Sequence, residues 1–233
     1  MIRQTLFATA ITDQKPILTG SLFDLKDGFL KVVSIDGFRL ALRKEKIACT
    51  DRLKFVVPGK TLSELSKLLS DDEEKTLSIQ IGPKHIVFVC GAYNVISRLL
   101  EGEFLDYDAA IPASSLTTVR VDAKKFTESI ERIALLITDR LKSPIRCEFA
   151  QSKIAVSCST AIGKAFDELA VDLSGEAVSI GFNSRYLTDA LKACECEEVK
   201  IESSGPLSPM KIVPVSGEDF LFLVLPVRLK NEN

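Results

Sequence analysis

Three aspartates, Asp36, Asp106 and Asp108, carry the side chains in this chain that are best suited to acid–base chemistry. Two nearby carboxylates can divide the roles of general acid and general base. Asp36 precedes a glycine, and Asp-Gly is typical of turns because glycine accepts a positive φ and the Asp side chain bonds to neighbouring amides. Turn and linker formation explain these aspartates better, so a carboxylate-dependent hydrolase using Asp36 and Asp106 is the weakest alternative.

Other catalytic or ligand-binding signatures are sparse. The single histidine, His85, begins an apolar stretch, where we expect a surface position on a strand rather than a catalytic triad or a metal site. Cys194-Glu-Cys196 has no further Cys or His ligand nearby, so packing at a helix end is favoured over metal binding. No glycine-rich phosphate-binding motif occurs, and the acidic run Asp71–Glu74 lacks the spacing of a calcium loop. The sequence predicts no enzyme, no metal and no cofactor.

Length and composition restrict the class of protein. The 233 residues suffice for one large domain or two of ordinary size, and the net charge of −2 excludes a polycation. Six cysteines are scattered without a Cys-x-x-Cys pair, which is typical of a reducing cytoplasm. No apolar stretch reaches the roughly 20 residues that span a bilayer, and the N-terminus does not read as a signal peptide. We predict a cytoplasmic protein without membrane contact.

One structural unit occurs nearly twice along the chain. FVVPGKTLSELSKLL predicts a strand followed by a helix that a capping box, Thr61-x-x-Glu64, would open. VSIGFNSRYLTDALKAC repeats this plan with Asn183 as N-cap. The apolar stripes at helical spacing are Leu62, Leu65, Leu68 and Leu69 in the first copy and Leu187, Ala190, Leu191 and Cys194 in the second.

The segments upstream of these helices also match each other. SLFDLKDGFLKVVSI and RCEFAQSKIAVSCST each predict a strand, a polar turn and a strand. The segment 101–116 between the copies contains turn residues and no clear period, so we place the domain boundary there, with domains at 1–113 and 114–233. Each copy predicts an α+β domain of two helices and about eight short strands, with antiparallel sheets covered by helices on one face.

The second copy begins with elements that the first copy does not repeat. It opens with the strand TTVRV, then Asp122 as N-cap and a helix whose apolar face includes Phe126, Ile130 and Ile133. IRQTLFATA at the start of the chain resembles the later half of that helix, with Arg3 matching Arg132. We expect the first copy to be truncated at its N-terminus and the chain to be a fragment of a longer protein.

Four segments resemble signature segments of a known family: SIDGFRLAL, EGEFLDYDAAIP, IGFNSRYLTDAL and VLPVRL. They are similar to the bacterial sliding clamp, the beta subunit of DNA polymerase III, and the similarity runs through nearly the whole chain in order. It covers the second and third of that family's three domains. The resemblance implies two tandem copies of the DNA-clamp fold, with antiparallel sheets outside and two helices per domain facing the interior of a ring.

The resemblance also implies a function. Members form head-to-tail homodimeric rings around duplex DNA without reading its sequence, and they tether polymerases to the template without catalysing a reaction. Polymerases, the clamp loader and repair proteins insert short linear motifs into a pocket between the second and third domains. A peptide-binding adaptor that never encircles DNA is the main alternative.

The resemblance carries specific residues into this pocket. Matching positions are Leu18, Ile35, Gly37, Phe38, Arg39, Leu40, Leu105, Ala110, Leu223, Leu225, Pro226, Val227 and Arg228, with a second subsite at Asn183, Tyr186, Ser208 and Met210. Arg39 and Arg228 would offer hydrogen bonds at the rim. Leu105, Asp108-Ala109 and Phe38 depart from residues common in the family, and we expect them to alter the polar rim and the motif preference more than the apolar pocket.

Basic residues on the predicted helices would face DNA in such a ring. These are Arg3, Lys60, Lys67, Arg132 and Lys192, and weaker candidates on nearby loops are Lys15, Arg140 and Lys142. Composition alone favours ordinary solvated helix faces. In a ring these cations would contact phosphates without reading bases, so binding would be weak and sensitive to salt.

Overall fold

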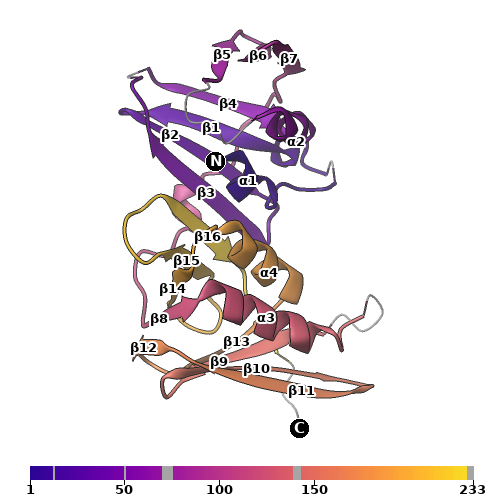
Figure 1. Ribbon diagram of the computed structural model, residues 1–233, viewed down its shortest axis with the longest axis vertical. Helices are drawn as coiled ribbons and strands as arrows, with labels where there is room; N and C mark the ends of the chain where they lie inside the picture. The colour runs from indigo at the N-terminus through magenta and orange to yellow at the C-terminus, as the bar shows by residue number, and fades with distance from the viewer. Residues whose placement is uncertain (13, 50, 70–75, 139–142, 230–233) are drawn as a thin grey trace. The chain divides into compact units, whose positions relative to one another are not determined.

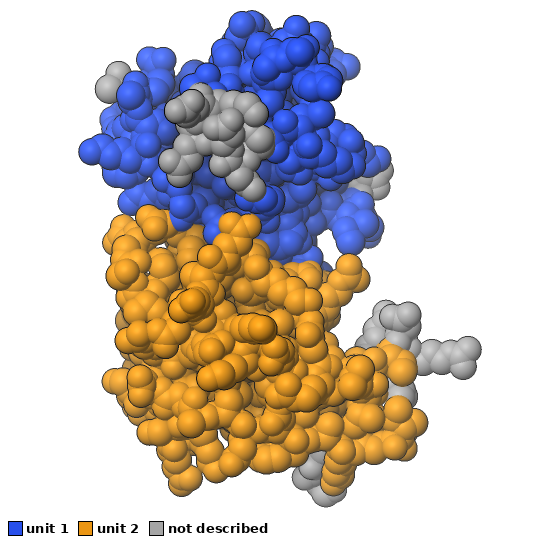
Figure 2. Space-filling view, in the orientation of Figure 1, with its two compact units in different colours: residues 1–107 blue, residues 108–233 orange. Residues whose placement is uncertain are grey.

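A computed structural model describes residues 1–12, 14–49, 51–69, 76–138 and 143–229 of the chain. The acidic run Asp71–Glu74 and the loop cations Arg140 and Lys142 lie outside these residues. The chain forms two compact units, Met1–Tyr107 and Asp108–Asn233 (Figure 2). We call them unit 1 and unit 2, and we describe each by itself.

Unit 1 combines two helices with two groups of antiparallel strands (Figure 1). Four strands pair in the order β3-β2-β1-β4, and three more pair in the order β5-β6-β7. Their bounds are β1 Gly20–Lys26, β2 Phe29–Ile35, β3 Arg39–Lys46, β4 Leu53–Pro58, β5 Ser78–Ile81, β6 His85–Cys90 and β7 Tyr93–Arg98; the helices are α1 Ile2–Leu6 and α2 Gly59–Leu68, with a 3-10 turn, η1, at Pro16–Thr19.

The core of unit 1 lies where α2 meets both groups of strands. Leu62 and Leu65 of α2 are fully buried and belong to one cluster with Phe23 of β1 and Phe88 of β6. The β1–β2 turn at Asp27-Gly28 has a positive φ at both residues, which suits the right-handed twist of paired strands. The predicted hairpin of the first copy and the first two residues of its helix stripe are therefore present.

Two details of the predicted helix at 59–68 are wrong. The helix begins at Gly59, and its N-cap Pro58 makes no side-chain capping bond. Thr61 therefore lies inside the first turn, where its hydroxyl bonds to the Ser97 hydroxyl at 2.7 Å instead of capping the helix. Leu68, expected in the apolar stripe, is 38% exposed, because the core cluster is already filled by Leu62 and Leu65 one and two turns earlier.

Unit 2 has the same architecture with additional strands (Figure 1). Five strands pair in the order β12-β8-β14-β15-β16, and four pair in the order β11-β10-β9-β13. Their bounds are β8 Thr117–Asp122, β9 Ile145–Ala150, β10 Lys153–Thr160, β11 Gly163–Ala170, β12 Asp172–Gly175, β13 Val178–Phe182, β14 Glu198–Ser203, β15 Met210–Pro214 and β16 Phe220–Val224; the helices are α3 Ala123–Ala134 and α4 Ser184–Ala193, with a 3-10 turn, η2, at Asp108–Ala110.

The two long helices of unit 2 begin as the sequence predicts. The Asp122 carboxylate accepts a hydrogen bond from the Lys125 amide at 2.9 Å, and the Asn183 side chain accepts bonds from the Arg185 and Tyr186 amides. Each cap satisfies amides that have no partner within the helix. The predicted apolar faces of α3 and α4 are buried, and the two helices lie next to each other (Figure 1).

All strand pairs within both units are antiparallel, as predicted for an α+β fold. Within the described part of the chain, no helix has both the length and the apolar character needed to cross a bilayer.

Candidate functional site

Asp36 and Gly37 form the tight turn between β2 and β3, as the Asp-Gly pair predicted. Ile35 and Leu40 pair across its base. The Asp36 carboxylate accepts hydrogen bonds from the amides of Phe38, at 2.9 Å, and Arg39, at 3.1 Å. Gly37 has φ +92°, and a Cβ placed there would meet no atom within 4 Å. Glycine is thus required for the backbone conformation and not for lack of space.

Arg39 is buried, whereas the resemblance implied an arginine at a pocket rim. Its Nε donates to Asp36 Oδ2 at 2.9 Å, and its guanidinium lies 5.4 Å from the centre of the Phe7 ring. The side chain is 7% exposed. Its neighbour Phe38, by contrast, is 58% exposed. The turn therefore presents an aromatic ring on its surface and a positioned cation beneath it.

The remaining predicted pocket residues of unit 1 divide into core and surface. Leu18, Ile35 and Leu40 are buried and are part of the core. Leu105 is 42% exposed. A ligand could reach Gly37, Phe38 and Leu105 without any rearrangement of unit 1.

In unit 2 the C-terminal segment lies beside the start of α4. β16 ends at Val224, and the Val227 amide then donates to the Gly181 carbonyl at 2.8 Å. Gly181 lies two residues before the helix cap Asn183, so this bond brings the tail beside the start of α4. A Cβ at Gly181 would lie 2.4 Å from the Val227 carbonyl oxygen, so the close approach requires glycine.

The other predicted residues of unit 2 differ in exposure. Leu225 and Val227 are 37% and 40% exposed, and Arg228 and Ala110 are exposed as well. Pro226, Tyr186 and Ser208 are half-buried. Leu223 and Met210 are buried core residues, so only a change in side-chain packing would bring them to a ligand.

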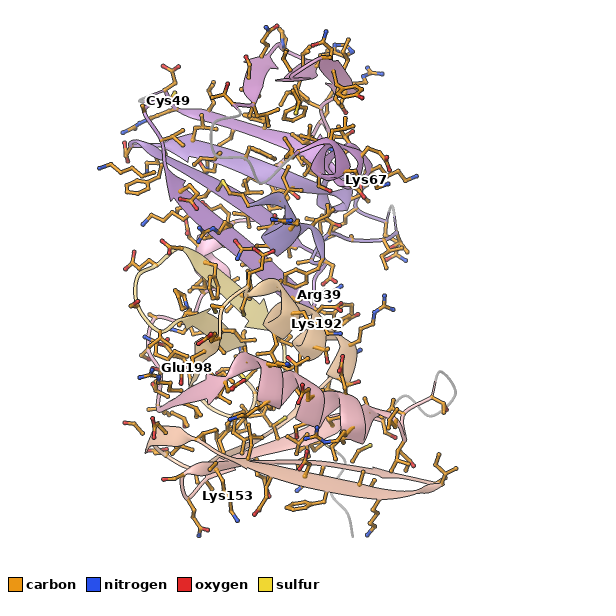
Figure 3. All side chains as sticks on the ribbon, viewed as in Figure 1. Arg39, Cys49, Lys67, Lys153, Lys192 and Glu198 are labelled. Carbon is orange, nitrogen blue, oxygen red and sulfur yellow. The ribbon has the colours of Figure 1, made fainter. Side chains whose placement is uncertain are left out.

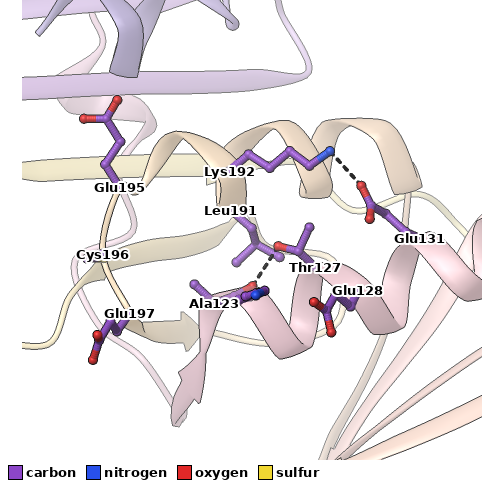
Figure 4. Close-up of a pocket in the computed structure, with 10 residues that line it drawn as sticks. Ala123, Thr127, Glu128, Glu131, Leu191, Lys192, Glu195, Cys196 and Glu197 are labelled. Atoms are coloured by element: carbon purple, nitrogen blue, oxygen red, sulfur yellow. Dashed lines mark hydrogen bonds and ion pairs between the residues drawn. The ribbon is translucent and has the colours of Figure 1, made fainter.

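Ion pairs with carboxylates hold Lys67, Arg132 and Lys192 of the predicted DNA-facing set. Lys67 on α2 lies 2.7 Å from Glu64, and Lys192 on α4 lies 2.6 Å from Glu131 of α3 (Figures 3 and 4). Arg132 on α3 donates from Nε and Nη2 to Asp167 of β11, at 3.1 and 2.6 Å. This hydrogen bonding lowers the pKa of Asp167. Arg3 and Lys60 are exposed on α1 and α2.

A groove of about 590 Å³ runs between α3 and α4 (Figure 4). Its charged lining combines two cations with four carboxylates: Lys124, Lys192, Glu128, Glu131, Glu195 and Glu197. This excess of carboxylates lowers the positive potential that Arg132 and Lys192 would otherwise create on these helices.

The residues considered for catalysis or metal binding lie at the surface or make other contacts. The described residues contain no group of three or more His, Cys, Asp or Glu side chains that could hold a metal ion. His85 is exposed at the start of β6, and Asp36 is engaged in its turn. Cys194 is buried at the end of α4, where its thiol bonds to the Ala190 carbonyl, as expected for helix-end packing. Burial raises the pKa of the Cys147 and Cys194 thiols, which makes them poor nucleophiles.

Two interacting residues, Asp24 and Tyr107, are not among the predicted site residues. Asp24 interrupts the apolar run of β1 and is 5% exposed, and the Tyr107 hydroxyl donates to it at 2.8 Å. A carboxylate within an apolar strand and a lone tyrosine in a turn-rich segment were visible in the sequence. Their separation of 83 positions in the sequence gave no sign of the contact.

Two family models match consecutive parts of the chain. They are the "DNA polymerase III beta subunit, central domain" over residues 1–106 and the "DNA polymerase III beta subunit, C-terminal domain" over residues 108–228. The beta sliding clamp of Bacillus subtilis is 34% identical over 233 residues, which cover 98% of this chain and 61% of that protein. The chain thus spans about three fifths of the length of this relative.

Solved structures agree with the sequence matches. The DNA polymerase sliding clamp of Bacillus subtilis superposes with a TM-score of 0.94 at 34% identity and covers 98% of this chain, which spans 61% of it. A Pseudomonas aeruginosa sliding clamp bound to griselimycin gives 0.93 at 29% identity, covering 98% of this chain and 62% of its own. Both units therefore have the DNA-clamp fold predicted from the sequence. Because models of two consecutive domains together match nearly the whole chain, the chain belongs to the DNA polymerase III beta subunit family.

Proposed function

We propose that the chain provides two domains of a processivity clamp, a ring that encircles duplex DNA and recruits replication and repair proteins. The observation that carries this proposal is the ordered match of the central and C-terminal domain models to residues 1–106 and 108–228. The role is non-catalytic and needs no cofactor, and the compartment is the bacterial cytoplasm. Polymerases, the clamp loader and repair proteins bind through short linear motifs.

The exposed apolar residues among the predicted set support a peptide-binding surface. Phe38, Leu105, Leu225 and Val227 combine apolar side chains with at least a third of their surface exposed. A few such anchors usually provide most of the affinity for a peptide. Leu and Phe side chains of a linear motif are suitable partners for them, and the exposed Arg228 supplies a donor at the rim.

Ring assembly is supported by the free side of β11, the last strand of its group in unit 2. Phe166 on β11 is 66% exposed, and Leu135 at the end of α3 is 81% exposed. An end strand with exposed apolar neighbours is suited to pairing with another chain. In the homodimeric ring, β11 pairs with the first domain of a partner chain.

A titration of a fluorescent Gln-Leu-x-Leu-Phe peptide tests the proposed pocket. Leu40→Ala is a poor probe, because Leu40 is 3% exposed and its truncation would destabilise the core. Leu225→Ser removes an exposed anchor instead, and Leu207→Ser, at a residue 73% exposed, is the matched control. We expect Leu225→Ser to weaken binding about 5- to 30-fold, which corresponds to about 1–2 kcal/mol. Equal binding by both variants would refute this location.

A peptide-binding adaptor that does not encircle DNA is a second candidate. It is favoured by the ion pairs of Lys67, Arg132 and Lys192, which reduce the charge available to phosphates. Titration with duplex DNA at low and high salt separates the two functions. Weak, salt-sensitive binding that falls in Lys60→Glu supports a clamp. Peptide binding without any DNA binding at low salt supports an adaptor.

A further inference from the structure

Asp24 is buried on the face of β1 opposite the apolar core. Side chains alternate along a strand, and Phe23 belongs to the core cluster, so the Asp24 side chain points away from it. On that face it lies between Lys31 of β2 and Lys54 of β4, its partners in the register. Leu22, the preceding residue on that face, is 4% exposed, so the face is covered, and the Asp24 carboxylate is buried with it at 5% exposed.

Tyr107, the last residue of unit 1, covers this carboxylate. Its hydroxyl donates to Asp24 Oδ2 at 2.8 Å, and Lys54 Nζ lies 3.1 Å from the same oxygen. Lys31 Nζ lies 5.4 Å from the centre of the Tyr107 ring, a distance suited to a cation–π contact. Tyr107 is itself 4% exposed. The other oxygen, Asp24 Oδ1, has no hydrogen-bond partner among the described residues, so the buried carboxylate depends on Tyr107 and Lys54.

The chain that follows Tyr107 is attached separately to unit 2. Lys211 Nζ donates to the Pro112 carbonyl at 3.3 Å, and the Leu116 amide donates to the Ser203 carbonyl at 2.8 Å. Residues 108–111 remain between the two attachments, and most of them form the 3-10 turn η2. Tyr107 therefore decides where the segment leaves unit 1.

We propose that the Tyr107–Asp24 hydrogen bond is a latch that positions residues 105–110 for peptide binding. The proposal rests on the proposed function, because Leu105 and Ala110 lie two residues before and three residues after Tyr107 and belong to the proposed peptide-binding surface. With the latch closed, the position of Tyr107 is fixed, and Leu105, two residues earlier, is held in place. With the latch open, the same segment samples other positions that do not bind the peptide.

The loss of peptide affinity expected when the latch opens follows from the fraction of molecules that keep the binding-competent arrangement. If the binding-competent arrangement falls to about 0.1–0.3 of the molecules, the apparent Kd rises about 3- to 10-fold. The association rate falls by the same factor, while the dissociation rate is unchanged, because every bound molecule has the latch closed. A side chain that merely stabilised unit 1 would not produce this pattern in the rates.

Tyr107→Phe is the central variant, since it removes the hydroxyl and keeps the ring. Tyr93→Phe, at a residue 60% exposed on β7, is the matched control. Asp24→Ala removes the acceptor, and Asp24→Asn keeps an acceptor for the hydroxyl and should restore near-normal binding. The double variant Tyr107→Phe with Asp24→Ala should bind no more weakly than either single variant, because both remove the same bond.

Two measurements on the full chain test the latch: hydrogen exchange of the amides in 101–111, and stopped-flow binding of the labelled Gln-Leu-x-Leu-Phe peptide. We expect Tyr107→Phe to accelerate exchange and slow association 3- to 10-fold, with Tyr93→Phe unchanged. Unchanged exchange, or faster exchange with unchanged association, overturns the latch while leaving the peptide-binding proposal intact. If the unmodified chain binds no peptide, the proposed function and the positioning role both fail. The exchange data then show separately whether the hydrogen bond holds the segment.

Discussion

Unit 1 and unit 2 repeat one plan, but among the described residues only unit 2 has the strand β8 and its partner β12. In unit 2, β8 lies between β12 and β14. The segment after β3 in unit 1 and the segment after β11 in unit 2 begin with equivalent hydrogen bonds. The Ile47 amide donates to the Gly28 carbonyl, and the Val171 amide donates to the Ser152 carbonyl, both at 2.9 Å. Residues 47–49 and 51–52 nevertheless form no strand. Within the described residues, the two units therefore differ at this edge of the sheet.

The same difference affects burial in the two cores. Ile201 of β14, which pairs with Val119 of β8, is 2% exposed. Ile79 of β5 points to the same face as the core residue Phe88 but is 37% exposed, since β6 is its only strand neighbour in the described residues. One side of the core of unit 1 is therefore less enclosed than the corresponding side of unit 2.

The largest effects should come from truncating matched core leucines. Leu62 of α2 and Leu187 of α4 occupy the fourth position of their helices, and both are fully buried. We expect Leu187→Ala to cost about 4 kcal/mol and Leu62→Ala about 2–3 kcal/mol, because the less enclosed core can relax around the lost side chain. Urea unfolding measures both, with the exposed Leu207→Ala as control. A larger cost for Leu62→Ala would contradict the difference in enclosure.

The next effect concerns the segment that follows the last strand of each unit. The Leu100 amide bonds to the Val56 carbonyl in unit 1, as the Val227 amide bonds to Gly181 in unit 2. Gly181→Val gives unit 2 the residue of unit 1 at this position, but its Cβ would lie 2.4 Å from the Val227 carbonyl oxygen. We expect a loss of about 1–3 kcal/mol and faster hydrogen exchange at Val227.

Gly82→Ala is the control for Gly181→Val, because its Cβ would meet nothing closer than 3.4 Å. Slow exchange at Val227 in the Gly181→Val variant would show that the tail tolerates a side chain there. The two units would then be more alike than their glycine and valine suggest.

Helix starts provide a third, smaller contrast. Asn183 caps α4 through its side chain, whereas Thr61 of α2 bonds to Ser97. Asn183→Ala should cost about 1 kcal/mol, and Thr61→Ala about 0.5 kcal/mol, the value of one partly exposed hydrogen bond. Thermal unfolding of both variants measures the difference. An equal stability loss of 1 kcal/mol or more in Thr61→Ala would indicate that Thr61 caps the helix, as the sequence predicted.

Low pH should lower the unfolding free energy of unit 2, because two of its carboxyl groups, Asp167 and Glu202, have a lowered pKa. At Glu202, burial opposes ionisation, but hydrogen bonds from Lys211 and Lys200 outweigh it. A carboxyl group with a lowered folded-state pKa contributes stability above its unfolded value, here near 4.5 for Glu202, and loses it as pH falls through the folded value. We expect the unfolding free energy to decline below about pH 4.5, and less steeply in Glu202→Gln. Identical pH profiles would exclude this role for Glu202.

The smallest effect should come from the ion pair across the groove of unit 2. Both partners, Lys192 and Glu131, are about half exposed, so Glu131→Gln should change stability by less than about 0.5 kcal/mol. Removing this carboxylate should raise the affinity for duplex DNA about 2-fold at low salt, because one more cation becomes available to phosphates. Glu218→Gln, outside the helices, is the control. Weaker DNA binding by Glu131→Gln would show that α3 and α4 do not face DNA.

Much of the fold could be read from local signals. The caps Asp122 and Asn183, the hairpin turns at Asp27-Gly28 and Asp36-Gly37, and the apolar stripe of α4 are all present as predicted. Each of these depends on residues within a few positions of one another. The capping box at Thr61 failed because the first turn of α2 starts at Gly59, where the chain leaves β4.

The candidate site could be predicted less completely. The sequence and its family resemblance named the turn at Asp36, the tail after Val224 and the cap at Asn183. They did not reveal that Arg39 is buried against Asp36 and Phe7, or that Lys192 pairs with Glu131. Exposure and ion pairing depend on neighbours that a linear pattern does not specify.

The sequence by itself determined the duplication and the element types, because these follow from periodicity, caps and turn residues close together in the chain. It indicated the family only through the resemblance of four segments to known signature segments. Only the tertiary structure decided that Tyr107 bonds to Asp24 across 83 residues, and that Gly181 admits the Val227 carbonyl. Contacts of this kind form when separate elements pack together. Their energies therefore depend on distances in space, which the order of residues leaves open.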